Sequence, residues 1–280
     1  MNLYAFELGR IKDLCASELT TVLKDHKLVD KNIDTLIFEM DLGDAQALQD
    51  QLGGTIKIVE VFNKISTLDE AEPAIEAFLK EGFTDGSGKI PFSITTLSFK
   101  RSQQPNIKQL LNFSKKTLKS LGLNSRFVNK GPFSPPPSTI YKARVIEKGV
   151  DLNIIQGQHG IYLGKAVAIQ NIDAYSKRDF DKPNRDARVG MLPPKLAQIM
   201  INLAGDSKTI YDPFCGTGTV PMEALLMKKD AIGSDIDERL VDYSEKNLQW
   251  LEHEFETTNK YRIFKSDAQR FHSAWSVLPF

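Results

Sequence analysis

The chain has 280 residues, with 36 Lys or Arg and 36 Asp or Glu, so its formal net charge is zero. This length suits two domains or three small ones. Its 41% hydrophobic and 26% charged residues are ordinary for a soluble globular protein. The composition therefore excludes a disordered, collagen-like or membrane protein, and the neutral charge argues at first against a basic nucleic-acid-binding protein.

The charges are unevenly distributed along the chain. Residues 86–188 contain 18 Lys or Arg and 6 Asp or Glu, a net charge of +12, and the rest of the chain carries −12. Residues 86–146 contain 11 Lys or Arg and no acidic residue. Nucleic acid therefore stays open as a partner.

Cysteine and histidine content excludes two further classes of protein. Two cysteines cannot form a disulfide framework, and four scattered histidines do not have the spacing of a metal site. The N-terminus lacks the pattern of a signal peptide, and no apolar run approaches the length of a membrane span. We expect a cytoplasmic protein with no metal and no membrane partner.

The first two thirds of the chain alternate short strands with helices, which is typical of an α+β fold. The pattern predicts strands over residues 3–8, 33–40, 55–62, 92–99, 150–156 and 161–169. It predicts helices over residues 11–23, 44–52, 72–80, 105–122 and 138–148. On the helix over 105–122, Lys108, Lys115 and Lys119 share the face opposite the apolar stripe.

The last third of the chain has a different pattern. Residues 171–195 alternate basic and acidic residues and contain few apolar ones, which indicates a charged linker. From residue 196 onward, helical and strand patterns follow in the order α, β, α, β, α, β. Strands that alternate with helices favour a parallel, doubly wound sheet.

A glycine turn lies between the first strand and the next helix of this last region. It reads Asp-Pro-Phe-Cys-Gly-Thr-Gly-Thr over residues 212–219, and Gly216 and Gly218 allow a tight turn close to a ligand. Asp235 ends the second strand, where an acid is placed to bind ribose hydroxyls. Asp267 ends the third strand, where a carboxylate can accept a hydrogen bond from an adenine amino group.

Two common phosphate-binding motifs do not fit this turn. Its glycine spacing is not that of the dinucleotide motif, and no Lys-Ser or Lys-Thr follows, so it is not a P-loop. The alternative is that the glycines form only a turn and that the acids only cap helices. Because the three acids end successive strands and would line one crevice, we favour a nucleoside-binding site.

These motifs resemble the tRNA guanine-10 N2-methyltransferase family and, more broadly, RNA methyltransferases that contain a THUMP domain. The resemblance rests on residues 212–219 and on Gly-Met-Leu-Pro-Pro-Lys-Leu-Ala-Gln-Ile-Met-Ile-Asn-Leu-Ala over residues 190–204. Residues 52–58, Leu-Gly-Gly-Thr-Ile-Lys-Ile, and the basic middle segment are similar to the N-terminal part of that family.

The resemblance implies a mixed fold class, α/β and α+β. We expect a ferredoxin-like domain over 1–66, a THUMP RNA-binding domain over 67–170 and the charged linker over 171–195. An incomplete, Rossmann-like methyltransferase domain of class I would span 196–280. The implied cofactor is S-adenosyl-L-methionine, and the implied partner is tRNA.

The resemblance also assigns residues to the cofactor. Asp212, Gly216 and Gly218 would hold its methionine end, Asp235 its ribose and Asp267 its adenine. Met191 and Pro193 would close the pocket. The remaining members of the expected site are the neighbours of these residues: Pro213, Phe214, Thr217, Ile236 and Ala268.

The sequence departs from the family after Asp267. The family has a fourth strand that ends in Asp-Pro-Pro-Tyr or a relative, which binds the target amino group, and no such motif follows here. We therefore assign no catalytic residue and expect a chain truncated before that motif. Strand 209–212 would then be a bare sheet edge.

Basic residues of the middle segment are the candidates for RNA contact, because neutralised phosphates release counterions. The candidates are Lys100, Arg101, Lys108, Lys115, Lys116, Lys119, Arg126, Lys130, Lys142 and Arg144. The alternative is a solvated basic face that only improves solubility.

The resemblance leaves several functions open. The expected reaction forms N2-methylguanine in tRNA, at a position of the guanine-10 type. Another tRNA or ribosomal RNA guanine, a DNA target, or an inactive RNA-binding fragment are the alternatives. Some members of the family act with a small activating protein, so the resemblance allows such a partner here.

Overall fold

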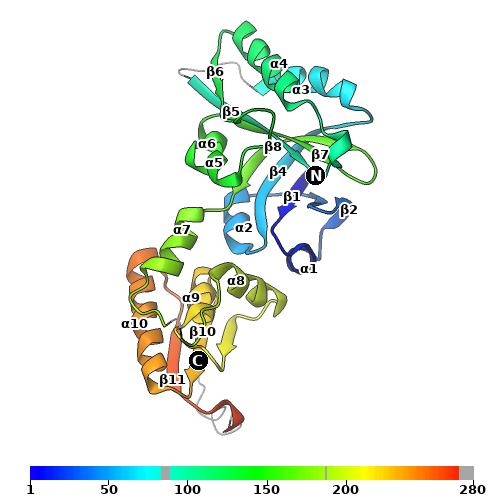
Figure 1. Cartoon of the computed structure of the whole chain (residues 1–280). Helices are drawn as coiled ribbons and strands as arrows, with labels where there is room; N and C mark the ends of the chain where they lie inside the picture. Colours follow the sequence, from blue (N-terminus) through cyan, green and yellow to red (C-terminus); the bar gives the residue numbers. More distant parts are fainter. Residues whose placement is uncertain (83–88, 187, 271–280) are drawn as a thin grey trace. The chain divides into compact units, whose positions relative to one another are not determined.

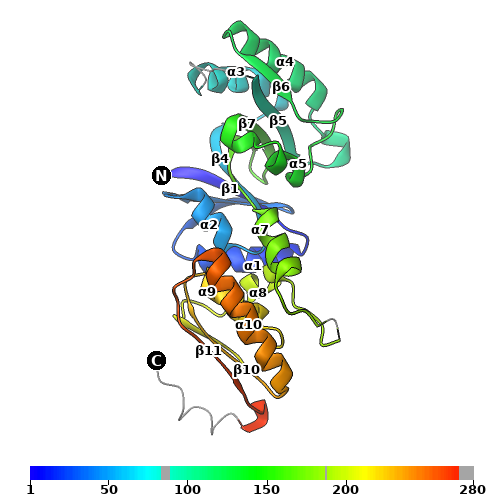
Figure 2. The same cartoon turned by 90° about the vertical axis from the view of Figure 1, so that its left-hand side faces the viewer.

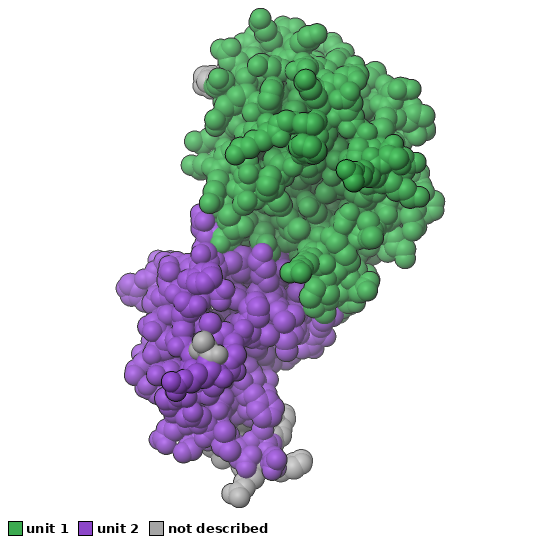
Figure 3. Space-filling view, in the orientation of Figure 1, with its two compact units in different colours: residues 1–50, 54–172 green, residues 51–53, 173–280 purple. Residues whose placement is uncertain are grey.

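The computed structural model describes residues 1–82, 89–186 and 188–270, and these form two compact units (Figure 3). Unit 1 comprises residues 1–50 and 54–172, and unit 2 comprises residues 51–53 and the residues from 173 onward. The end of the chain at Phe280, on which the prediction of a truncated domain bears, lies outside the described residues.

Unit 1 is built on one eight-stranded sheet with the order β2-β3-β1-β4-β8-β7-β5-β6 (Figure 1). Most neighbours are antiparallel, but β5 runs parallel to both β6 and β7. The strands are β1 (Asn2–Leu8), β2 (Lys27–Asn32), β3 (Thr35–Met40), β4 (Thr55–Ile65), β5 (Lys89–Leu97), β6 (Asn124–Phe127), β7 (Val150–Gln156) and β8 (Ile161–Ile169).

The pairing of β4 with β8 joins the first and second predicted domains in a single sheet. Eight pairs of residues connect the two strands, from Lys57 with Ile169 to Ile65 with Ile161. Strands from both predicted domains therefore share one set of backbone hydrogen bonds. The boundary at residue 66 stays a prediction.

Among the described residues, six α-helices accompany this sheet, and α3 and α4 pack together against one of its faces, as the views in Figures 1 and 2 agree. Their apolar residues share one core with Phe92, Ile94, Leu152 and Ile154 of the sheet. The helices are α1 (Lys12–Val22), α2 (Ala45–Gln51), α3 (Ala71–Gly82), α4 (Ile107–Ser120), α5 (Pro137–Lys142) and α6 (Val145–Lys148).

Helix α4 confirms the amphipathic pattern of its sequence. Ile107, Leu110 and Leu118 are buried, and the side chain of Asn106 caps the helix by accepting from the N–H of Gln109. The lysines of the opposite face are exposed. This helix therefore buries its apolar stripe and presents its charge to solvent.

The predicted helix over 138–148 is divided into α5 and α6. Arg144 lies between them with a φ of 52°, in the left-handed region that ends a helix. The sequence does not show this break, because Arg is not a residue that usually adopts this conformation. Strands β2 and β6 were also missed, because β2 has only one apolar pair among charged residues and β6 has four residues.

A buried ionic network lies in the sheet of unit 1. The Nζ of Lys57 is 2.7 Å from Oδ2 of Asp151 and 3.6 Å from Oε2 of Glu7. Burial alone would lower the pKa of Lys57, but the two carboxylates outweigh it and the pKa is raised. Ser93 and Thr95 donate hydrogen bonds to the other oxygen of Asp151. The network thus satisfies a lysine whose side chain is only 1% exposed.

Unit 2 has a three-stranded parallel sheet with the order β11-β10-β9. Because the strands follow in sequence order, right-handed crossovers place α9 and α10 on one face of the sheet. The strands are β9 (Thr209–Asp212), β10 (Asp230–Asp235) and β11 (Tyr261–Lys265). The helices are α7 (Ile172–Ser176), α8 (Pro194–Leu203), α9 (Thr219–Leu226) and α10 (Glu238–Phe255), with a π-helical turn over Lys177–Asp181.

The predicted charged linker over 171–195 is partly folded. Arg178 of the π-helical turn is buried, and its guanidinium binds both carboxylate oxygens of Glu223, at 2.7 and 3.2 Å. Lys182 is also buried and donates to Oγ1 of Thr219 at 3.3 Å. The alternation of charges therefore reflects ion pairing with α9 and not only solvation.

Replacing Asp151 with Ala tests the buried network. We expect the free energy of unfolding of unit 1 to fall by about 3–5 kcal/mol, because the ammonium of Lys57 loses its closest carboxylate. Urea titration followed by circular dichroism measures the change. Glu76→Ala is the matched control: it breaks the exposed pair with Lys80 and should cost about 0.5 kcal/mol or less. Equal losses in the two variants would contradict the account.

Candidate functional site

The parallel sheet of unit 2 brings the ends of β9 and β10 to the same edge. Gly233 of β10 is the register partner of Asp212, the last residue of β9, so Asp235 lies two residues further along. Carboxyl ends of adjacent parallel strands are where α/β sheets bind ligands. Asp212 and Asp235 line one cavity. Their roles in binding a ligand stay predictions.

The turn after β9 depends on two glycines. Gly216 has a φ of 55° and Gly218 a φ of 86°, both in the left-handed region that favours glycine. A Cβ on Gly218 would lie 3.0 Å from Oγ of Ser244, whereas one on Gly216 would meet no atom nearer than 4.0 Å. Gly218 is therefore required by crowding and conformation, and Gly216 leaves open space in the cavity wall.

Hydrogen bonds connect this turn to the neighbouring strand and helix. The N–H of Gly216 donates to Oδ2 of Asp235 at 3.0 Å, and the N–H of Cys215 donates to the carbonyl of Ser234 at 2.9 Å. The hydroxyl of Ser244, on α10, donates to the carbonyl of Gly216 at 2.8 Å. The backbone of the turn is thus fixed before any ligand binds.

The two acids of the cavity differ in their surroundings. Asp235 accepts from the backbone N–H of Gly216 and of Asp237, both at 3.0 Å. Asp212 accepts from the N–H of Phe214 at 3.0 Å. Burial raises the pKa of Asp212, and the negative charge of Asp235 adds to this effect. An uncompensated carboxylate of this kind attracts a cationic group.

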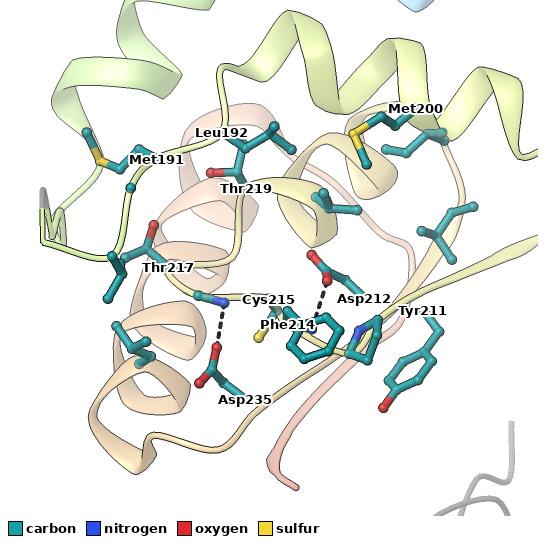
Figure 4. Close-up of a pocket in the computed structure, with 18 of the residues that line it drawn as sticks. Met191, Leu192, Met200, Tyr211, Asp212, Phe214, Cys215, Thr217, Thr219 and Asp235 are labelled. Carbon is teal, nitrogen blue, oxygen red and sulfur yellow. Dashed lines mark hydrogen bonds between the residues drawn. The ribbon is translucent and has the colours of Figure 1, made fainter. Parts of the chain in front are cut away.

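The cavity has a volume of about 810 Å³, in the range of small-molecule sites. Figure 4 shows Met191, Leu192 and Met200 along one side of it and the turn with Asp212 and Asp235 along the other. Seven residues of the predicted cofactor site line it: Met191, Asp212, Pro213, Phe214, Gly216, Thr217 and Asp235.

Among the described residues, five members of the predicted cofactor site do not line this cavity. Pro193 precedes α8 as its N-cap, Gly218 precedes α9, and the side chain of Ile236 is 66% exposed. Asp267 accepts from the N–H of Gln269 and Ala268 begins the short turn that follows. The roles of these residues stay predictions.

The structure adds apolar lining residues that motif reasoning missed. The cavity is lined by Leu192, Met200, Ile201 and Val220, and also by Tyr211 of β9. The hydroxyls of Tyr211 and Ser234 are 2.8 Å apart. Helical spacing of apolar residues in 196–203 was the available signal, but it does not show which of them turn towards a ligand.

Cys215 lies in the lining but is not suited to nucleophilic catalysis. Its side chain is buried, and burial raises the pKa of the thiol to about 12. The thiolate is therefore rare at neutral pH. The Sγ of Cys215 lies 3.6 Å from the Oγ of Ser244, so the side chain packs inside the turn. This contact favours a structural role for Cys215.

All ten predicted RNA-contact residues are exposed: Lys100, Arg101, Lys108, Lys115, Lys116, Lys119, Arg126, Lys130, Lys142 and Arg144. Four of them are on α4, and the ammonium of Lys115 lies over the ring of Phe127. Arg144 forms an ion pair with Glu147. Their exposure makes the other nine of these charges, all in unit 1, accessible to phosphates.

Two classes of feature are absent from the part of the chain that the structure describes. No helix there is both long and apolar enough to span a membrane. No cluster of three or more His, Cys, Asp or Glu side chains there has the arrangement of a metal site.

Comparison with known proteins shows what part of the second unit is similar to. Residues 183–274 match the family described as UPF0020: RMKL-like, methyltransferase domain. A tRNA (guanine(10)-N2)-dimethyltransferase of Methanothermobacter thermautotrophicus is 42% identical over 82 residues, 29% of this chain and 23% of that protein. The enzyme of the same name from Pyrococcus abyssi is 35% identical over 95 residues, 32% of this chain and 29% of that protein.

The matched stretch spans about a quarter of the length of these curated relatives. Within it, the comparisons confirm the predicted resemblance to tRNA guanine N2-methyltransferases. The match covers the turn at 212–219, which supplies several of the residues that line the cavity.

Two solved structures share the fold over almost the whole chain. TrmN from Thermus thermophilus has a TM-score of 0.56 at 14% identity, covering 97% of this chain and 74% of that one. A possible methylase from Clostridium difficile 630 has a TM-score of 0.52 at 14% identity, covering 96% and 76%. The predicted mixed α/β class is confirmed.

Gly218→Ala tests the geometry of the turn. We expect it to lower the free energy of unfolding of unit 2 by at least about 2 kcal/mol, because it adds crowding against Ser244 to a strained φ. Gly205→Ala is the control, since Gly205 has a φ of 92° but open space around it, and it should cost about 1 kcal/mol. Thermal unfolding monitored by calorimetry measures both, and equal costs would contradict a role for crowding.

Proposed function

We propose that the protein binds S-adenosyl-L-methionine in unit 2 and tRNA through unit 1, as part of an enzyme that methylates N2 of a guanine. The observation that carries this proposal is the cavity lined by the turn at 212–219, Asp212 and Asp235. It lies inside the stretch that matches methyltransferases. A guanine of the tRNA position-10 type is the favoured target, because the relatives of that stretch carry that name.

The residues present fit this cofactor. Gly216 leaves a cradle in the cavity wall that a Cβ would fill. Asp212 offers a carboxylate to the amino group of a methionine moiety, and Asp235 offers oxygens to ribose hydroxyls. The apolar side of the cavity, with Leu192 and Met200, suits carbon and sulfur atoms.

The chemistry assigns positioning roles to the chain's residues. When bound, the cofactor supplies an electrophilic methyl group to an amine. Asp212 and Asp235 hold the ligand through charge and hydrogen bonds, and the turn fixes both acids in place. Met191 and Leu192 cover the opposite side and exclude water. Orientation contributes much of the rate enhancement in such a transfer, because little acid-base chemistry is needed.

The predicted division of the chain becomes part of this proposal. Residues 1–66 would be a ferredoxin-like domain and 67–170 a THUMP domain, and together they would present the basic face to tRNA. Residues 171–195 would connect them to the cofactor-binding part over 196–280. A small activating protein and a cytoplasmic location stay predictions.

A second candidate function is RNA binding without methyl transfer. It is favoured by the position of strand β9, which is an edge of the three-stranded sheet among the described residues. In the family that the sequence resembles, a further strand carries the motif that binds the target amino group, and no such strand pairs with β9 among these residues. Cofactor affinity separates the two candidates, because a binding module needs no working cavity.

Calorimetric titration with S-adenosylmethionine tests the cofactor site. We expect binding at neutral pH that weakens as the pH falls, because protonated Asp212 no longer attracts the cationic ligand. Since the pKa of Asp212 is raised, the loss should begin at a higher pH than for an ordinary aspartate.

Asp212→Asn separates this effect from general unfolding. It should weaken binding about tenfold or more at neutral pH and remove most of the pH dependence. Asp242→Asn, which changes an exposed acid paired with Lys246 outside the cavity, is the control and should bind normally. Absence of binding by the folded wild-type chain would contradict the cofactor assignment.

Filter binding with tRNA tests the basic face. We expect the affinity to fall steeply with salt, and Lys115→Glu combined with Lys119→Glu to reduce it about tenfold or more at low salt. Lys27→Glu with Lys31→Glu, on β2, is a matched change of charge outside the basic segment. Salt-independent binding, or equal effects of the two pairs, would count against this face.

A further inference from the structure

The loop between β6 and α5 presents an aromatic side chain to solvent. Phe133 is 70% exposed, and no ring contact with it occurs among the described residues. A single exposed Phe needs no explanation by itself. The informative observation is the set of hydrogen bonds that holds the loop around Phe133.

Buried hydrogen bonds hold this loop against β5. The side chain of Asn129, which is only 6% exposed, accepts from the N–H of Ile94 and donates to its carbonyl, at 3.1 and 2.8 Å. It also donates to the carbonyl of Phe133 at 2.9 Å. Ser134 then accepts from the N–H of Thr96 at 2.9 Å. The loop is thus fixed on both sides of Phe133, and the ring is displayed on a rigid support.

Basic residues lie in this loop and in a neighbouring segment of the chain. The hydroxyl of Thr96, which is within 3.2 Å of the Ser134 hydroxyl, also donates to the side chain of Gln104. The segment with Lys100 and Arg101 therefore approaches the loop, which itself carries the exposed Lys130. No acidic residue occurs anywhere in 86–146.

This combination favours nucleic acid over protein as the occupant. A protein-docking site would present a broader apolar surface with mixed charges, whereas here the exposed ring belongs to a segment whose charged residues are all basic. An aromatic ring beside phosphate-binding cations is the arrangement that binds single-stranded RNA, because every unpaired base can stack on it. A base within a duplex cannot reach such a ring, since its faces are covered by its neighbours.

We propose that Phe133 stacks on an unpaired base of the RNA, while Lys100, Arg101 and Lys130 bind the adjoining phosphates. The proposal rests on the proposed RNA-binding function and adds the kind of nucleotide that this part of unit 1 contacts. Stacking of one base is worth about 1–3 kcal/mol, which corresponds to about 5- to 150-fold in affinity.

Fluorescence anisotropy with the full chain and two labelled RNAs tests the proposal. The probes are a 12-nucleotide single strand and a blunt-ended 12-base-pair duplex without unpaired bases. Phe133→Ala should weaken single-strand binding at least fivefold and leave duplex binding almost unchanged, whereas Phe133→Trp should retain binding. Ile33→Ala is the control, because Ile33 is an equally exposed apolar residue of unit 1, at 69%.

The outcomes distinguish this proposal from the proposed function. If the wild-type chain binds RNA and Phe133→Ala binds the single strand equally well, stacking is wrong, while the basic face still stands and a protein becomes the better occupant for Phe133. An equal loss for both probes also overturns stacking. If the wild-type chain binds neither these probes nor tRNA, the RNA-binding function itself fails.

Discussion

The hydrogen bond from the backbone of Gly216 to the carboxylate of Asp235 connects the parts of the candidate site. It joins the turn after β9 to the end of β10, and the neighbouring bond from Cys215 to Ser234 runs in the same direction. The turn can follow this path because Gly216 and Gly218 adopt left-handed conformations. The position of Asp212, the start of α9 and the open cradle at Gly216 all follow from it, so the cavity is shaped by the backbone before a ligand arrives.

The candidate binding surfaces of the two units carry opposite charges. The acid-free basic stretch lies entirely in unit 1, where its lysines and arginines are exposed on helices α4 and α5, on strands β5 and β6 and on the loops around them. The cavity of unit 2 contains two carboxylates instead, one of which has a raised pKa. The charge of unit 1 therefore suits a polyanion, and the charge of the cavity in unit 2 suits a small cationic ligand. The neutral net charge of the whole chain conceals this difference.

Sequence reasoning succeeded where local chemistry determines structure. The apolar stripe of α4 and the order of strands in unit 2 follow from periodicity, and the turn at 212–219 follows from its glycines. Sequence reasoning failed where contacts between residues far apart in the chain determine the local structure. Strand β2 is held partly by Asp30, which accepts from Tyr162 and from the backbone of His159, more than 120 residues away. Likewise, Arg178 looks like a linker charge until Glu223 is seen to bind it.

The candidate site shows the same limit. Carboxyl ends of parallel strands meet by topology, so Asp212 and Asp235 could be paired from sequence. The apolar side of the cavity could not, because only the packing of α8 decides that Met200 turns towards it. Phe133 illustrates the point in unit 1: the loop that carries it is held by a buried asparagine, Asn129, which bonds to Ile94, 35 residues away.

Hydrogen–deuterium exchange on the full chain tests most directly whether the cofactor binds unit 2 and tRNA binds unit 1. With S-adenosylmethionine, we expect amide exchange to become slower in residues 212–219 and 235–240 and to stay unchanged in unit 1. With tRNA, it predicts slower exchange in residues 100–145. Protection of the basic segment by the cofactor alone, or no protection of the turn at any cofactor concentration, would contradict the account.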